Sequence, residues 1–216
     1  MLEKMGAFFE ARLNGYEEHQ LTCIDSAGEF YPFTAGCLPR AAGASILDLG
    51  CGTGLELGYY FELVPDAKVT GVDLAPGMLD ALRKKFPDKA LILVAGSYFE
   101  TPFGERAFDA AVSVESLHHF TKEEKIPLYE RVRKALKPGG FFIITDYFAA
   151  SEEEERFRRA ELLRLRKEQG IEDGELYHYD TPLTVEHEKE ALLTAGFSSV
   201  TVLKGWGATY TLKANR

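Results

Sequence analysis

The sequence is poor in cysteine and contains no long apolar run. Its 3 cysteines, Cys23, Cys37 and Cys51, form no C-x-x-C pair, and their odd count argues against a disulfide framework or a structural zinc site. The opening MLEKMGAFFEARL carries charges where a secretory signal needs an apolar stretch, and no run approaches the length that spans a membrane. We therefore expect a soluble, cytoplasmic protein with no membrane partner.

Basic residues are also in the minority. The chain has 25 Lys and Arg against 34 Asp and Glu, which gives a formal net charge of -9. Phosphate backbones and anionic lipids bind clustered cations, so this balance disfavours both as partners. We expect no nucleic-acid partner, and the composition leaves a homodimer open.

Short apolar runs alternate with amphipathic stretches from residue 45 onward. Such strands, alternating with helices, are typical of a parallel sheet that is covered on both faces and binds its ligands at the carboxyl ends of the strands. The strands are expected at 45–49, 68–72, 90–95, 108–114 and 141–146, and the helices at 55–64, 76–86 and 122–136.

The end of the chain departs from this alternation. A helix near 185–195 precedes two strand-like runs, Ser199–Leu203 and Ala208–Leu212, separated by the turn-like Lys204-Gly205-Trp206-Gly207. The predicted fold class is α/β, a three-layer Rossmann-like sandwich whose mostly parallel sheet is closed by an antiparallel C-terminal hairpin.

Two segments lie outside this core of a single domain that spans 1–216. Residues 1–43 are expected to form an N-terminal helical cap. Residues 151–183 follow the fifth strand directly, begin with a charged helix and end in a polar loop that contains Tyr177, His178, Tyr179 and Asp180. Because strand ends border the ligand crevice, we expect this second segment to be an inserted cap or lid.

The stretch ILDLGCGTG, residues 46–54, follows a predicted strand and opens a helix. Its glycines let the backbone turn sharply and approach a ligand closely. A dinucleotide fingerprint, G-x-G-x-x-G, would need a glycine where Leu55 stands. Asp48, two residues before the first glycine, suits a cationic ligand better than a diphosphate.

A second acidic residue, Asp73, ends the second predicted strand about twenty residues past the glycines. An acidic residue at this point can accept hydrogen bonds from both ribose hydroxyls of a nucleoside. Leu74 and Met78 follow it and can pack against an adenine. The alternative is that Asp73 only caps the next helix.

These motifs resemble, in order, those of the Rossmann-like (class I) S-adenosylmethionine-dependent methyltransferases. The segments that carry the resemblance are ILDLGCGTG, VTGVDLAPGML, AGSYFETPF, FDAAVSVESLHHF, LKPGGFFIITDYF and LLTAGFSSVTV, which together span roughly residues 45–213. The resemblance implies a seven-stranded sheet with an antiparallel last strand, S-adenosylmethionine as cofactor, and methyl transfer as the activity.

The resemblance also assigns cofactor-binding residues. It places the methionine half of the cofactor against Asp48, Gly50, Gly52 and Gly54, and it places the ribose at Asp73. The adenine is expected to contact Leu74, and Ser97 and Tyr98 occupy the turn that reads its edge. Ser97 departs from the family's frequent Asp, and its hydroxyl is a weaker acceptor than a carboxylate. Cys51 fits as a small side chain in a tight turn.

The methyl acceptor is less clearly indicated. Ser113-Val114-Glu115-Ser116 follows the fourth strand where base-amino methyltransferases carry an N/D-P-P-Y motif. The expected acceptor is therefore a small molecule. Tyr16 and His19 belong to a segment that, in similar enzymes, folds over the cofactor, and we expect them to contact the substrate. Ordinary helix packing is the alternative for both.

Glu115, His118 and His119 form E-x-x-H-H just past the fourth strand. If a helix begins there, the three side chains project from one face and can act on the acceptor or bind a metal. The alternative is one histidine in the core and Glu115 at the methionine end of the cofactor. We expect Glu115 and His119 to be catalytic and no metal to bind, because the cluster lacks the distant ligand that metal sites add.

Two other classes of function stay open. Nothing in the sequence proves turnover, so a non-catalytic module that binds S-adenosylmethionine is the main alternative. An NAD-dependent oxidoreductase is disfavoured by Leu55, and propylamine transfer is disfavoured because no Asp pair for a polyamine is apparent.

Overall fold

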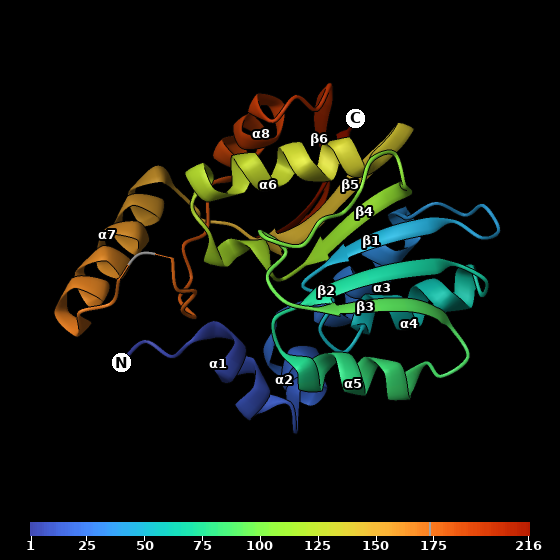
Figure 1. The fold of residues 1–216 in the computed structure, drawn as a ribbon. Helices are drawn as coiled ribbons and strands as arrows, with labels where there is room; N and C mark the ends of the chain where they lie inside the picture. Colours follow the sequence, from blue (N-terminus) through green and yellow to red (C-terminus); the bar gives the residue numbers. More distant parts are fainter. Residues whose placement is uncertain (173) are drawn as a thin grey trace.

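A seven-stranded sheet runs through the middle of the molecule, with helices on both faces (Figure 1). The computed structural model describes residues 1–172 and 174–216. The strand order is β3-β2-β1-β4-β5-β7-β6. The three-layer α/β sandwich predicted from the sequence is confirmed.

The first five strands are parallel and form the side of the sheet that borders the glycine turn. Their carboxyl ends therefore meet at one edge. The strands are β1 (Ser45–Leu49), β2 (Lys68–Asp73), β3 (Ala90–Ala95), β4 (Phe108–Val114) and β5 (Leu136–Tyr147). Burial on both faces explains why the central strands β1 and β4 read as continuous apolar runs, whereas Ile92 on the edge strand β3 is exposed.

Helices from two parts of the chain cover the two faces. On one face, α6 (Lys122–Ala135) and α8 (Val185–Thr194) pack over the core that contains Leu47 and Phe142. On the other face, α3 (Ala27–Cys37), α4 (Leu55–Leu63) and α5 (Pro76–Lys85) pack over the core that contains Ile46 and Val112.

The third helix belongs to this sandwich and not to a cap over the strand ends. Ala27, Phe30, Tyr31, Thr34 and Ala35 are all buried, and they recur at the spacing of one helical face. This apolar stripe packs against α4 and β5. The part of the N-terminal segment that can cover the cleft is therefore confined to residues before α3.

The C-terminal hairpin forms as predicted, but its turn is shorter. β6 (Ser199–Trp206) and β7 (Thr209–Asn215) pair antiparallel, and β7 is antiparallel to β5. The expected turn at Lys204–Gly207 was wrong, since Trp206 still pairs with Thr209. Trp206 is held in the strand because its ring packs on Phe33 and its N–H donates to Glu29.

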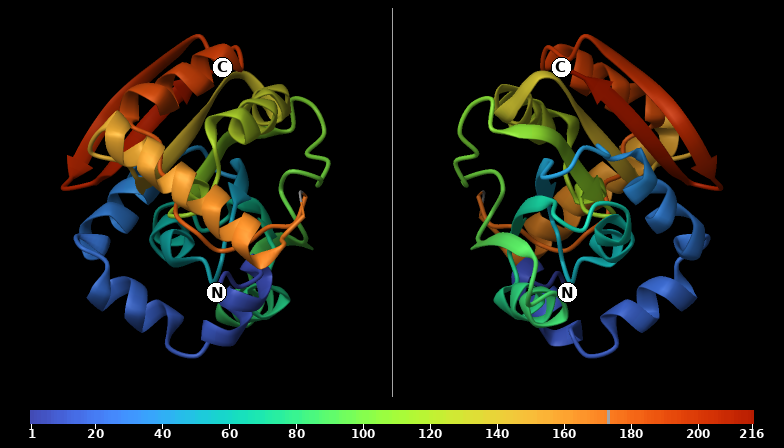
Figure 2. Two further views of the ribbon diagram at one scale, coloured as in Figure 1. Left: turned by 90° about the vertical axis from the view of Figure 1, so that its left-hand side faces the viewer. Right: turned by 90° about the vertical axis from the view of Figure 1, so that its right-hand side faces the viewer.

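The remaining helices lie at the carboxyl edge of the sheet. They are α1 (Met5–Arg12), α2 (Tyr16–Cys23) and α7 (Glu152–Gln169), and Figure 2 shows α7 crossing in front of the strand ends. The predicted cap at 151–183 includes residue 173, which lies outside the described residues. Among those described, no helix combines the length and the apolar character needed to cross a membrane.

One buried ion pair ties the two helices of a face together. Lys125 on α6 and Glu188 on α8 are 2.7 Å apart and only 2% and 1% exposed, and Tyr129 also donates to Glu188. We predict that Lys125→Met lowers the free energy of unfolding by about 3–5 kcal/mol, because it leaves Glu188 charged and buried. Urea unfolding measures this.

The exposed Lys134 on the same helix provides the matched control, since Lys134→Met removes a charge that nothing buried depends on. Adding Glu188→Leu to Lys125→Met removes the orphaned carboxylate and recovers most of the loss. Equal stability of the Lys125 and Lys134 variants would show that the buried pair is not needed.

Candidate functional site

A narrow cleft of about 50 Å³ lies where β1, β2 and β4 end. Its walls come from the glycine turn, the end of β2, the segment after β4 and the N-terminal helices. The residues that line it are Met5, Phe9, Tyr16, Gly50, Gly52, Asp73, Leu74, Met78, Tyr98, Glu115, Ser116 and His119. None of these is Lys or Arg.

The three glycines of the turn play different parts. All three have a positive φ, of 73°, 47° and 70° for Gly50, Gly52 and Gly54. Residues that carry a Cβ rarely adopt such values. A Cβ on Gly50 would lie 2.1 Å from the Ser116 hydroxyl, whereas one on Gly52 would face the cleft, 3.8 Å from Tyr16. Gly54 lies at the start of α4 and does not line the cleft.

Asp73 fixes the glycine turn to the end of β2. One oxygen of its carboxylate accepts from the Gly52 N–H and the other from the Ala75 N–H, both at 2.9 Å. Leu74 and Met78 form an apolar wall beside it. The carboxylate therefore presents its remaining lone pairs at the floor of the cleft.

Two further carboxyl groups are buried beneath the turn. Asp48 is fully buried, and neither oxygen finds a hydrogen-bond donor among the described residues. Its neighbour is the buried carboxyl of Glu56, with which it can bond only when one of the two is protonated. Burial, and then Glu56, raise the pKa of Asp48 well above its usual range. Cys51 is also buried and packs against Gly71, away from the cleft.

The turn after β3 contributes one of its two predicted residues. Tyr98 lines the cleft, and its hydroxyl donates to the Ser116 carbonyl at 3.4 Å. Ser97 does not line the cleft, because its hydroxyl accepts from the Phe99 N–H at 3.2 Å and closes its own turn.

A second, larger cavity of about 730 Å³ adjoins the cleft. Phe9, Tyr16, Glu115 and His119 line both spaces, so they form the boundary between them. His19 lines only the larger cavity, which also contains Arg12, Gln20, His118, His178 and Asp180. Tyr16 and His19 both line this cavity, and their contact with a substrate stays a prediction.

Glu115 stands at this boundary in an unusual conformation. Its φ is 49°, one of few positive values outside glycine, and such strain is concentrated at functional sites. Its buried Oε1 has no hydrogen-bond donor among the described residues. Burial, together with the carboxylate of Asp146, raises the pKa of Glu115 to about 8.

His118 is held in place by a buried carboxylate at the end of β5. Asp146 accepts from the backbone N–H groups of Leu117, His118 and Tyr147 and contacts His118 Nδ1 at 2.6 Å. Burial alone would lower the pKa of His118, but the carboxylate of Asp146 outweighs it and raises that pKa to about 9.

His119 contacts a different carboxylate. Its Nδ1 lies 3.1 Å from Asp180 and 3.3 Å from the Tyr179 carbonyl, both in the loop before α8. Burial and the neighbouring His118 lower the pKa of His119 to about 4. Leu117–His119 is a short 3-10 helix, so the expected single helical face does not form. The two imidazoles instead lie with ring centroids 4.0 Å apart.

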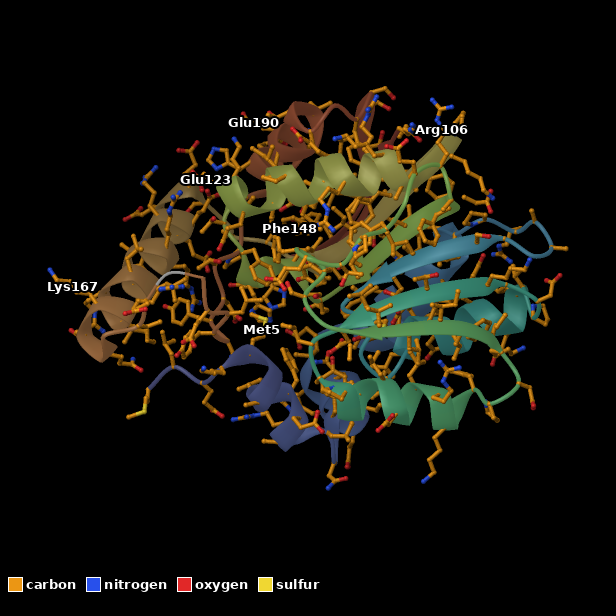
Figure 3. The ribbon with its side chains drawn as sticks, viewed as in Figure 1. Met5, Arg106, Glu123, Phe148, Lys167 and Glu190 are labelled. Atoms are coloured by element: carbon orange, nitrogen blue, oxygen red, sulfur yellow. The ribbon has the colours of Figure 1, made fainter. Side chains whose placement is uncertain are left out.

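The two cap segments are joined to each other over these cavities. The Met5 N–H donates to the Leu176 carbonyl and the His178 N–H to the Glu3 carbonyl, both at 2.9 Å. Lys4 forms an isolated antiparallel bridge to Tyr177. We call residues 2–5 and 175–178 the roof. Figure 3 shows Met5, the first residue of α1, on the side of this helix that faces the strand ends.

Side chains reinforce the roof. The ring of Phe8 stacks on His178 with centroids 3.5 Å apart, and Lys4 pairs with Glu175 at 2.7 Å. Glu10 on α1 accepts from the Gly77 N–H at the start of α5, where a carboxylate is favoured by the helix dipole. The N-terminal helix is thereby anchored at both ends.

Sequence reasoning missed several residues of this site. It assigned no role to Met5, Phe9, Asp146, His178 or Asp180. The position of the polar loop that contains His178 and Asp180 could have indicated that it borders the site, since it follows the helix after the fifth strand. Its partners on η1 (Leu117–His119) and α1 could not be inferred without the three-dimensional arrangement.

Comparison with known proteins gives a consistent picture. Residues 46–140 match the family model of a methyltransferase domain. The biotin biosynthesis bifunctional protein BioHC of Teredinibacter turnerae is 33% identical over 135 residues, covering 58% of this chain and 23% of that protein. The fatty-acid O-methyltransferase of Mycolicibacterium smegmatis is 32% identical over 104 residues, covering 48% and 37%. The chain thus matches less than half the length of each.

Solved structures agree on the fold. An S-adenosylmethionine-dependent methyltransferase from Mesorhizobium loti superposes with a TM-score of 0.63 at 23% identity, covering 86% of this chain and 96% of that one. The names of further relatives include methyltransferases of erythromycin, of a tRNA uridine and of a sterol. The acceptors in these names differ widely.

We predict that the two segments of the roof open together. In Phe8→Ala, the amide hydrogens of residues 2–5 and 176–178 exchange faster by the same factor, because each segment protects the other. Hydrogen exchange with mass spectrometry measures this. Phe157→Ala removes an exposed ring on α7 and is the matched control. Faster exchange in one segment alone would contradict a joint roof.

Proposed function

We propose that the chain, as a class I S-adenosylmethionine-dependent methyltransferase whose cofactor is S-adenosylmethionine, transfers a methyl group from this cofactor to a small-molecule acceptor. The glycine cleft is the proposed cofactor site, and the larger cavity is the proposed acceptor site. A methyl transfer between them requires the sulfonium to lie at their boundary, beside Glu115 and His119.

One observation supports this cofactor above all. The buried Oε1 of Glu115 lacks a donor among the described residues, and Glu115 lines the cleft together with Asp73. Asp48, whose oxygens also lack donors, lies buried beneath the glycine turn. Buried carboxyl groups without partners are costly, and a cation relieves that cost. S-adenosylmethionine carries an ammonium and a sulfonium. The diphosphate of NAD would meet carboxyl groups and no lysine or arginine here.

The proposed binding mode follows the walls of the cleft. The ribose hydroxyls would donate to Asp73, and the adenine would lie between Leu74 and Met78. The methionine half would lie over Gly50 and Gly52, where no Cβ blocks its approach. Tyr16, 3.8 Å from the Cβ position of Gly52, would cover it from above.

A small acceptor is supported by the shape and charge of the larger cavity. His178 of the roof lines this cavity, and Arg12, the one arginine that lines it, already pairs with Glu3 at 3.0 Å. A nucleic acid would require an open, cationic groove. We expect Glu115 and His119 to orient the acceptor and to assist the loss of its proton, with His19 as a further contact.

We predict that S-adenosylmethionine and its demethylated product bind in isothermal calorimetry and that NADH does not.

Gly52→Val should abolish binding of S-adenosylmethionine, because the valine side chain would occupy the space of the ligand. Asp73→Ala weakens binding by about 1.5–3 kcal/mol, the scale of hydrogen bonds to a charged group. NADH binding without S-adenosylmethionine binding would reject the proposal.

Gly139 gives a matched control for the glycine variant. It also has a positive φ, of 79°, but a Cβ there meets nothing within 4 Å, and the residue is far along the chain from the turn. Gly139→Val tests strain without a blocked cleft, so its affinity for the cofactor should equal that of the wild type. An equal loss in both variants would mean that strain, and not the cleft, causes the effect.

We predict that Glu115→Gln and His119→Ala each slow turnover, His119→Ala by at least about 100-fold, while cofactor affinity changes little. A screen of small amines, phenols, thiols and carboxylic acids first identifies an acceptor, and release of S-adenosylhomocysteine measures the rate. Wild-type rates in both variants would remove the pair from the mechanism. Binding without turnover on any acceptor would favour the non-catalytic module.

A further inference from the structure

Three side chains from two separate parts of the chain converge at the wall of the larger cavity. Asp180 Oδ1 lies 3.1 Å from His119 Nδ1 and 3.6 Å from His118 Nε2. All three atoms lie within 4.8 Å of one another. The histidines follow β4, whereas Asp180 comes from the loop between α7 and α8, more than sixty residues away in the sequence.

These separations are those of ligands around one metal ion. A zinc-sized ion binds imidazole nitrogen and carboxylate oxygen at about 2.0–2.2 Å, which in a tetrahedral site places the ligand atoms about 3.3–3.5 Å apart. The observed 3.1 and 3.6 Å fall on either side of this range. Together with the 4.8 Å limit on all three separations, these distances are compatible with one shared ion.

His118 is also oriented as a ligand would be. Its Nδ1 contacts Asp146 at 2.6 Å, so its Nε2 points toward Asp180. Asp146 is itself fixed by the backbone N–H groups of Leu117, His118 and Tyr147. A carboxylate that orients a histidine from its far side is the usual support of a metal-binding imidazole.

We propose that His118 Nε2, His119 Nδ1 and Asp180 Oδ1 bind a divalent first-row transition-metal ion whose open coordination position faces the acceptor cavity. Two imidazoles and one carboxylate favour ions such as Zn²⁺, Co²⁺ or Fe²⁺ over Mg²⁺ and Ca²⁺, which prefer oxygen donors. The sequence predicted no metal, because Glu115, His118 and His119 have no further ligand nearby in the chain. Asp180 is such a distant ligand.

The ion would define the class of acceptor, and this consequence rests on the proposed function. A hydroxyl or carboxyl oxygen of the acceptor would complete the coordination, and a metal-bound hydroxyl loses its proton more readily. His119 would then orient the acceptor through the ion. Glu115, on the side facing the cofactor cleft, stays free to contact the reacting groups.

Binding of Co²⁺ tests the site without any assay of turnover. The full chain is treated with a chelator, dialysed and titrated with Co²⁺ while its visible absorption is recorded. We expect one ion per chain with an intense visible band. Asp180→Asn and His119→Ala should abolish the band, and Asp146→Asn should weaken binding by about 10–100-fold, the usual effect of losing an outer-shell partner.

Two control variants each change an aspartate or a histidine that lies outside the proposed metal site. Asp88→Asn changes an exposed aspartate, and His187→Ala removes a histidine that pairs with Glu155 away from the cavity. Both should bind Co²⁺ as the wild type does. Circular dichroism confirms that each variant is folded, and Zn²⁺ displaces Co²⁺ in competition.

The inference is overturned if the folded wild type binds no Co²⁺, or binds it no more tightly than Asp180→Asn. Calorimetry with S-adenosylmethionine on the chelator-treated protein separates this from the proposed function. Retained cofactor binding with no metal site would overturn only the metal inference. Loss of cofactor binding in the wild type would overturn the proposed function.

Discussion

The buried carboxylate of Asp146 organises the acceptor side of the molecule. Its hydrogen bonds from the backbone N–H groups of Leu117 and His118 hold the short helix η1 against the end of β5. The carbonyl of His118 then accepts from the Thr181 N–H at 2.8 Å, which brings in the loop before α8. The preceding roof residues 175–178 are in turn hydrogen-bonded to residues 2–5. One charge thus links two strand ends, a histidine pair and both cap segments.

The cofactor side depends on the same kind of constraint. Asp48, Glu56, Asp73 and Glu115 place carboxyl groups under and around a turn that has no lysine or arginine on its walls. Burial, and then repulsion from Glu56 and Asp73, raise the pKa of Asp48. Burial, and then repulsion from Asp146, raise the pKa of Glu115. A ligand with positive charge removes that penalty. The selectivity of the cleft therefore lies in its charge as much as in its glycines.

The sequence predicted most of the sheet and the cofactor cleft, because these depend on local signals. Glycine spacing, an acidic residue at a strand end and apolar runs are all visible along the chain. The errors arose where distant contacts decide. Trp206 stays in a strand because it packs on Phe33, far away in the sequence. Ser97 is a different case, since a local hydrogen bond from the Phe99 N–H turns its hydroxyl away from the cleft. The meeting of His119 with Asp180 joins residues that no local pattern connects.

The roof has a kinetic consequence. Phe9 lines both cavities, and the helix that carries it is held by residues 2–5 at one end and by Glu10 at the other. If the cofactor and the acceptor bind in these two cavities, a movement of α1 would change access to both of them at once. An acceptor that contacts α1 would hold the roof shut and delay departure of the spent cofactor. Turnover would then be paced by release of products, in a fixed order, and not by the methyl transfer itself.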